Sequence, residues 1–289
     1  ARVTATAYPL ARRAIQMSSS STFTRPDGTV IHYKVYGRHR GGVPVLILAR
    51  GGMQSSMATL LHPSNPWNPV ERLSHDKYML ITMDQRMSRL DEDLPEDHDI
   101  GWETFRDDQI ALLDHLGVTG RNQCHLLGAC IGPSYALRLL RDFPDRFGRA
   151  VLLQPIGINV HTTEPKGWDG TNAGCENDHW FGSWAREMTS RGRASQGAVD
   201  RLHRNMFGPS RSDFVFSVTR EDVRTRIAHP LLVFCGRDIL HPAETAREIS
   251  RLASGRATLV EEWRDVGPEK LAVAERAIDQ FLCYKQDLL

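Results

Sequence analysis

The 289-residue chain contains no apolar run that reaches the roughly 18 residues needed to cross a bilayer. Its five cysteines are an odd number without a Cys-x-x-Cys spacing, so neither a disulfide framework nor a zinc site is expected. Lysine is scarce, and a net charge of +1 provides no basic surface for nucleic acid. We therefore expect a soluble protein with reduced thiols, no nucleic-acid or membrane partner, and a cytoplasmic location.

Acidic residues are also absent from residues 1–21, which combine three arginines with four consecutive serines. This composition is typical of organelle-targeting segments, but a simple tail can share it. We treat 1–21 as an N-terminal arm or tail and keep organelle targeting as the alternative to a cytoplasmic location.

The most informative stretch is an apolar run over 125–129 that leads through Gly128-Ala129-Cys130-Ile131-Gly132 into a helix-forming segment. Gly-x-nucleophile-x-Gly between a strand and a helix is the pattern of a nucleophile elbow, a sharp turn that lifts one side chain clear of the sheet. Cys130 would then lie at a helix N-terminus, where the helix dipole and unpaired amides favour the thiolate. The alternative is a buried cysteine between two chance glycines.

Strand-like and helix-like patterns alternate along the chain, which favours a mostly parallel sheet with helices on both faces. The ranges are a hairpin over 22–36, a helix over 102–116, strands over 125–129 and 149–154, a strand from 230, a helix over 243–252, a strand over 257–263 and a helix over 269–284. The periodicity fails between 157 and about 226. A segment of that length in a compact domain usually has structure or a function of its own.

Three further segments resemble the α/β-hydrolase family, and the likeness covers roughly residues 22–285. The strand over 45–53 ends in Arg50-Gly51-Gly52-Met53, where the family commonly has His-Gly. Residues 78–88 resemble its Asp-x-Arg strand end, with Met87 in place of the usual glycine. Residues 230–238 resemble the strand whose last residue, here Asp238, orients the catalytic histidine.

This resemblance implies an α/β-hydrolase fold, a mostly parallel twisted sheet with helices on both faces and a small cap insertion. The core would comprise 22–157 and 227–289, and the cap 158–226. The backbone amides of Ile131 and of Gly52 or Met53 would hold the oxyanion. In the cap, the side chains that would line a substrate pocket are those of Trp168, His179, Trp180 and Trp184. The tryptophans are equally consistent with a small core inside the cap.

The chain departs from the family in having no histidine from Pro242 onward, where the triad base is usually found. The nearest replacement is His241, three residues after Asp238, and the pair is expected at the carboxyl edge of the sheet. His241 could instead stabilise the start of the following helix. Asp265 lies near the usual histidine position, but an exposed carboxylate is a weak base at neutral pH. His161 and His179 of the cap are the next candidates for the base.

A cysteine nucleophile tolerates a missing base better than serine does, because part of the thiol is already ionised at neutral pH. Hydrolysis of the acyl-enzyme still requires a base. The sequence therefore favours a cysteine-dependent hydrolase of a small ester, lactone or thioester, acting through an acyl-enzyme on Cys130. A lyase, cyclase or acyltransferase on the same scaffold, or a binding protein with a vestigial site, are the alternatives. We expect a small-molecule substrate, no cofactor and no metal, and leave a homo-oligomer open.

Overall fold

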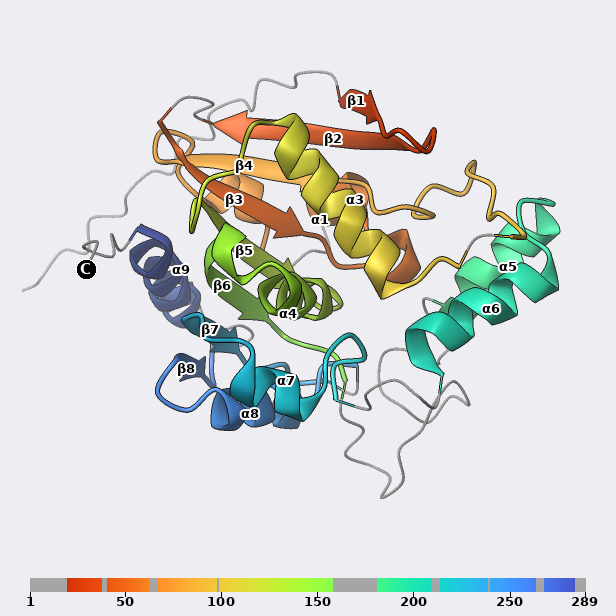
Figure 1. Ribbon diagram of the computed structural model, residues 1–289. Helices are drawn as coiled ribbons and strands as arrows, with labels where there is room; N and C mark the ends of the chain where they lie inside the picture. Colours follow the sequence, from red (N-terminus) through yellow and green to blue (C-terminus); the bar gives the residue numbers. More distant parts are fainter. Residues whose placement is uncertain are drawn as a thin grey trace, which may run out of the picture.

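The computed structural model describes residues 20–37, 41–62, 67–97, 99–157, 181–208, 214–238, 240–263 and 268–283. In this part of the chain, one twisted sheet forms the centre of the molecule, and helices cover it on both sides (Figure 1). The strands are β1 (Ser21–Thr24), β2 (Val30–Gly37), β3 (Val43–Leu48), β4 (Tyr78–Met83), β5 (Cys124–Ala129), β6 (Phe147–Leu153), β7 (Leu231–Phe234) and β8 (Ala257–Val260).

The order across the sheet is β1-β2-β4-β3-β5-β6-β7-β8. β1, β2 and β4 pair antiparallel, and all pairs from β4 to β8 are parallel. Because parallel strands end at the same edge, the loops after β3, β5, β6 and β7 lie together. β5, which precedes Cys130, is therefore flanked by β3 and β6 in the middle of the sheet.

The helices follow the alternation expected from the sequence. They are η1 (Gly52–Gln54), α1 (Met57–Leu61), α2 (Pro69–Arg72), α3 (Trp102–His115), α4 (Gly132–Asp142), η2 (Pro144–Arg146), α5 (Ser183–Ser190), α6 (Gln196–Phe207), α7 (Arg220–Thr225), α8 (Ala243–Leu252) and α9 (Pro268–Cys283). None of the described helices is long and apolar enough to span a membrane.

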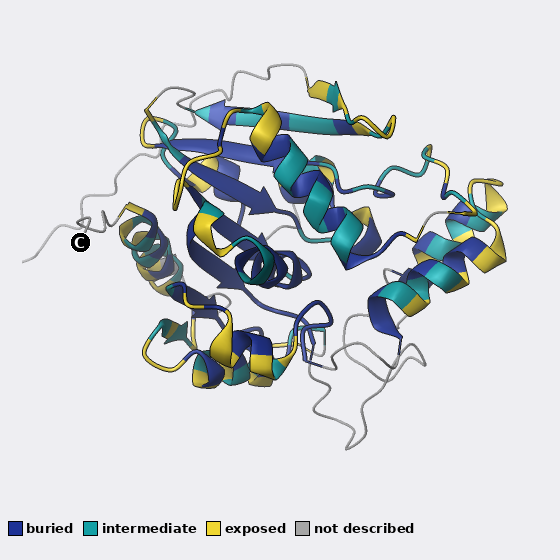
Figure 2. Ribbon diagram, in the orientation of Figure 1, coloured by how far each residue is buried: buried dark blue, intermediate teal, exposed yellow. Residues whose placement is uncertain are grey.

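Two apolar cores lie on opposite faces of the sheet. One packs α3, α4, α7 and α8 against the strands, and the other packs α1, α2 and α9. Figure 2 shows the central strands buried and the exposed residues on the outer surfaces of the helices, in the connecting loops and in the β1–β2 hairpin. Strands buried on both faces explain why their sequences read as continuous apolar runs rather than as alternating ones.

The β1–β2 hairpin is joined to the rest of the fold by a buried carboxylate. Asp108 of α3 has no solvent exposure and pairs with Arg25 of the hairpin and, through two hydrogen bonds of 2.7 and 2.8 Å, with Arg86 after β4. Arg86 belongs to the Asp-x-Arg sequence identified above. Its planar guanidinium suits this bidentate contact, so the motif has a structural role in this chain.

One strand is shorter than the sequence analysis predicted. The strand expected over 257–263 ends at Val260, and Trp263 instead turns into the core, where it is 1% exposed. Its indole nitrogen donates a hydrogen bond of 2.9 Å to the carbonyl of Cys235, and its ring packs on Phe234. Burying the Trp263 ring, with its indole nitrogen hydrogen-bonded, stabilises the fold more than an extension of β8 at the edge of the sheet would.

Helices α5 and α6 lie side by side, away from the sheet (Figure 1). Two indoles join them to the core: Trp184 of α5 donates to the carbonyl of Met87 and Trp102 of α3 donates to that of Met206, both over 2.9 Å. Helix α7, which the sequence analysis also placed in the cap, packs on α4 and α8. The division into core and cap stays a prediction.

Candidate active site

Cys130 occupies a strained turn between β5 and α4. Its φ of 63° lies in the left-handed region, which costs a residue with a side chain about 1–3 kcal/mol. The backbone at the C-terminal end of β6 holds this conformation: the Cys130 amide donates to the carbonyl of Leu153 over 3.0 Å, and the Cys130 carbonyl accepts from the amide of Ile156 over 3.2 Å. A non-glycine residue kept in this region is typical of a nucleophile elbow.

The two glycines of the motif are required by close packing. A methyl group on Gly128 would lie 2.4 Å from the carbonyl carbon of Gly132, and one on Gly132 would lie 2.4 Å from the carbonyl oxygen of Leu48 in β3. The turn therefore closes only because both positions lack a side chain. This agrees with the reason for which the sequence analysis singled out the motif.

Asp238 and His241 form a pair in the loop after β7. Oδ1 of Asp238 accepts hydrogen bonds from the amides of Leu240 and His241 and, over 2.7 Å, from Nδ1 of His241. A carboxylate only accepts hydrogen bonds, so Nδ1 carries the proton and the other ring nitrogen is directed away from Asp238. The aspartate thus fixes both the orientation and the tautomer of the imidazole.

The imidazole of His241 faces the Cys130 thiol. Its Nε2 atom is buried and forms no hydrogen bond with a nitrogen or oxygen of the described residues. Burial opposes its protonation, but the negative charge of the Cys130 thiolate and the contact with Asp238 outweigh burial and raise the pKa of His241 to about 9. Burial likewise opposes ionisation of Cys130, yet the positive charge of His241 outweighs burial and lowers the pKa of the thiol.

Compared with the free side chains, these shifts favour a thiolate beside an imidazolium. A thiolate is the nucleophilic form of cysteine, and the protonated Nε2 beside it is positioned to donate a proton. The three residues therefore lie in the order nucleophile, histidine, aspartate. The sequence analysis left two roles open for His241, and the geometry brings it to Cys130.

The backbone of Gly51 and of Ile131 also lowers the pKa of Cys130 and so favours its thiolate. Ile131 was expected from the sequence, but Gly51 was not. Gly51 has a φ of 119°, which only glycine adopts readily. Gly52 and Met53 are buried beside it at the start of η1, and their place in the oxyanion site stays a prediction.

Gly236 was not recognised in the sequence, although the site depends on it. A methyl group here would lie 1.9 Å from the carbonyl oxygen of His241 and 2.4 Å from its Cβ. The loop after β7 therefore folds back directly over Gly236, and this close approach brings His241 toward Cys130. The only sign of this role in the sequence was the position of the glycine, between a buried strand and the Asp238–His241 pair.

The predicted cap residues have different outcomes. Trp168, His179 and Trp180 lie outside the described residues, as do the alternative bases His161 and Asp265. Trp184 is described and is 1% exposed. With its indole packed on Phe181 and bonded to Met87, it belongs to the larger of the two apolar cores, where α5 meets the loop after β4. A role for Trp184 in the pocket stays a prediction.

A cavity of about 320 Å³ lies between α5 and α6. The residues around it include Arg186, Thr189, Asp200 and His203, and none of the residues that line it belongs to the group around Cys130. This cavity is therefore separate from the candidate active site. Among the described residues no cluster of histidine, cysteine, aspartate and glutamate is suited to a metal ion.

The loop after β4 contains a partly buried carboxyl group. Met87, in the position of the family's glycine, keeps the left-handed φ of 66°, and its amide donates to Oε2 of Glu92 over 2.7 Å. Burial raises the pKa of Glu92 to about 7 from its ordinary value of 4.5, and the hydrogen bond from Met87 only partly offsets this. Between the ordinary value of 4.5 and about pH 7, the folded protein therefore retains a proton that the unfolded chain has already lost, so folding stability falls over this range.

We expect Glu92→Gln to remove this fall in folding stability, while the amide oxygen of glutamine still accepts the hydrogen bond from the Met87 amide. The free energy of unfolding at pH 8 should rise by about 1–3 kcal/mol, with little change at pH 5. Urea denaturation at the two pH values measures this difference. Glu248→Gln is the matched control, because Arg251 lowers the pKa of Glu248 and its replacement should give no gain. An equal effect of Glu92→Gln at both pH values would contradict the assignment.

The fold is shared with several solved α/β hydrolases, whereas no protein-family model matches the chain. A meta-cleavage product hydrolase from Pseudomonas fluorescens IP01 is 18% identical, with a TM-score of 0.58 over 93% of this chain and 98% of that one. A serine hydrolase from the polyaromatic hydrocarbon-degrading bacterium Cycloclasticus zankles is 19% identical, with a TM-score of 0.59 over 91% and 97%. An α/β hydrolase from a Medee basin deep-sea metagenome library is 17% identical, with a TM-score of 0.56 over 93% and 99%.

At these identities the likeness concerns the fold. The chain has the α/β-hydrolase fold, as the sequence analysis predicted. A fold of this kind hosts many activities, so the chemistry has to be argued from the residues around Cys130.

Proposed function

We propose that the protein is a hydrolase that cleaves a small ester, lactone or thioester through an acyl-enzyme on Cys130. The observation that carries the proposal is the arrangement of the thiol, the imidazole of His241 and the carboxylate of Asp238 at the carboxyl edge of the sheet. The hydrolases with the same fold support it, among them one named a serine hydrolase. Here the elbow residue is cysteine, so the attacking atom would be sulfur.

In the first half of the reaction the Cys130 thiolate adds to the carbonyl carbon of the substrate. The amides of Gly51 and Ile131, whose backbone favours the thiolate, would stabilise the oxyanion that forms next to the sulfur. Such a donor contributes on the order of 3 kcal/mol in measured cases. When the tetrahedral adduct collapses, the leaving group takes the proton from Nε2 of His241, and a thioester to Cys130 remains.

In the second half, water attacks this thioester. The charge of the thiolate is the largest of the influences that raise the pKa of His241, and acylation removes that charge. The imidazole of the acyl-enzyme therefore loses its proton more easily, and its neutral Nε2 can accept a proton from the attacking water. Collapse then releases the acid and regenerates the thiolate with the imidazolium. One histidine thus serves both half-reactions, because its pKa depends on whether Cys130 is acylated.

The test is to trap the covalent intermediate on a p-nitrophenyl ester. Acid quenching during turnover, followed by peptide mass spectrometry, should place the acyl group on the peptide that contains Cys130. Cys130→Ala should give neither the adduct nor enzymatic release of nitrophenol, whereas Cys124→Ala, which alters a buried cysteine of β5, should retain both. Turnover that survives in Cys130→Ala would overturn the proposal. Ester formation from an added alcohol at the expense of the acid would instead indicate an acyltransferase.

A further inference from the structure

Tyr135 lies in the first part of α4, five residues after Cys130. With a rise of 1.5 Å per residue, its Cα is within about 8 Å of the elbow. Helical side chains lean toward the helix N-terminus, which for Tyr135 is the direction of Cys130. The sequence analysis assigned no role to this residue, and the proposed mechanism does not use it.

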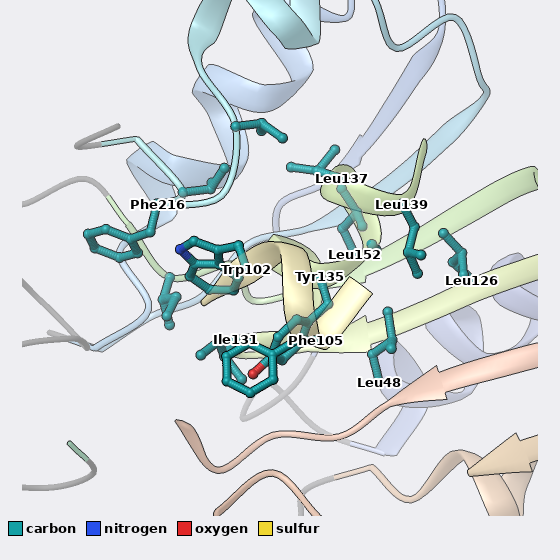
Figure 3. Packing of buried hydrophobic residues seen from close by; sticks show 14 of the residues in the cluster. Leu48, Trp102, Phe105, Leu126, Ile131, Tyr135, Leu137, Leu139, Leu152 and Phe216 are labelled. Atoms are coloured by element: carbon teal, nitrogen blue, oxygen red, sulfur yellow. The ribbon is translucent and has the colours of Figure 1, made fainter. Parts of the chain in front are cut away.

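The ring of Tyr135 is held by other aromatic side chains. Its centroid lies 5.3 Å from that of Trp102 and 5.8 Å from that of Phe105, both in edge-to-face contacts with α3. Figure 3 shows these rings in one cluster with Ile131, the residue that follows the proposed nucleophile. Trp102 also contacts Phe207 of α6, so the tyrosine lies where the elbow, α3 and the helices beyond the sheet meet.

The phenol oxygen of Tyr135 has no hydrogen-bond partner within the described residues, although the side chain is only 2% exposed. The oxygen is not one of the fully buried polar atoms that lack a hydrogen-bond partner. Part of the small exposed area of Tyr135 therefore belongs to this oxygen. A hydroxyl in apolar surroundings without a partner costs about 1–3 kcal/mol, which a ligand acceptor would recover.

The hydroxyl is also close enough to Cys130 for their charges to interact. Burial raises the pKa of Tyr135, and the Cys130 thiolate raises it further, so the phenol stays protonated. A protonated phenol beside a negative charge acts as a hydrogen-bond donor. The buried rings of Trp102 and Phe105 hold the phenol in this position.

We propose that the Tyr135 hydroxyl determines specificity by donating a hydrogen bond to an oxygen in the acyl portion of the substrate. The preferred acyl groups then carry an acceptor oxygen, such as an ether or ketone oxygen, beyond the carbonyl that Cys130 attacks. This inference rests on the proposed function, because the acyl portion is bound only if Cys130 is the nucleophile. A site with a buried donor discriminates against the analogue that lacks the acceptor.

The experiment compares two esters of nearly equal shape, p-nitrophenyl methoxyacetate and p-nitrophenyl butanoate. We expect Tyr135→Phe to lower kcat/KM for the methoxyacetate by about five- to tenfold and to leave the value for the butanoate within twofold. The quantity compared between variants is the ratio of kcat/KM for the methoxyacetate to kcat/KM for the butanoate. The different intrinsic reactivities of the two esters cancel in this comparison. Tyr36→Phe is the control, since Tyr36 is a buried tyrosine of β2 in the opposite core.

Thermal unfolding and the pH profile of Cys130 alkylation should be unchanged in Tyr135→Phe. An equal loss on both esters together with a lower melting temperature would assign Tyr135 a structural role and overturn the inference. Normal acylation of Cys130 with an unchanged ratio of the two esters would overturn it while leaving the proposed function intact. If neither ester acylates Cys130 in the native protein, the proposed function fails and the role of Tyr135 fails with it.

Discussion

Replacing His241 with asparagine is expected to slow turnover of a p-nitrophenyl ester by about a thousandfold, because general acid–base catalysis contributes a factor of this order. The two half-reactions should not suffer equally. Without the imidazolium, burial raises the pKa of Cys130 with less opposition, but the fraction of thiol that ionises at alkaline pH still attacks an activated ester. Hydrolysis of the thioester then lacks a base, so the acyl group should remain on Cys130 in near-stoichiometric amount.

The pH dependence of alkylation tests the same pair without a substrate. In the native protein the rate with iodoacetamide should stay high below the usual pKa of a thiol, since His241 lowers the pKa of Cys130. In His241→Asn the pKa of Cys130 is higher, so the thiolate is protonated at a higher pH than in the native protein. The alkylation rate should therefore already fall at alkaline pH.

His115→Asn is the control for this substitution. His115 also interacts through Nε2, with the hydroxyl of Tyr33, but at the end of α3 and away from Cys130. It should leave both turnover and the alkylation profile unchanged. Full turnover in His241→Asn would exclude the histidine as the base and direct attention to the part of the cap outside the described residues.

The sequence predicted the fold because its signals are local and consistent with one another. Gly128 and Gly132 can be read directly, since the strand, the turn and the helix all lie within about fifteen residues of Cys130. Buried parallel strands appear as apolar runs that need no knowledge of their partners. The end of β8 was less predictable, because its last residues exchange strand pairing for the burial of Trp263.

The site was predictable in its residue types but not in its geometry. The spacing of Asp238 and His241 suggested a pair, yet it left open whether the imidazole turns toward Cys130 or toward the following helix. That choice depends on contacts between segments distant in sequence, namely the loop after β7 and the elbow after β5. The left-handed backbone of Gly51 beside the site was not predictable either, because the sequence offers only the presence of a glycine.

Gly236→Ala should disable the site through a single methyl group, with an expected loss of turnover of about a hundredfold. The methyl cannot be accommodated in the present structure, because the atoms that it meets are the backbone oxygen and Cβ of His241, at 1.9 and 2.4 Å. Relief requires the loop from Asp238 to His241 to move outward, and the imidazole moves with it. A displacement of about 1 Å in a catalytic group is sufficient for a loss of this size.

The substitution leaves the nucleophile, the acid and the base in the chain, so the remaining measurements identify the cause. We expect circular dichroism to show an intact fold, because Gly236 follows β7 rather than lying within it. The alkylation profile of Cys130 should shift in the same direction as in His241→Asn, since the imidazolium has moved away from the sulfur. Gly197→Ala at the start of α6 has room for its methyl group and should change neither quantity. Native turnover in Gly236→Ala would mean that His241 reaches Cys130 without this close approach, and would remove the reason for a glycine at this position.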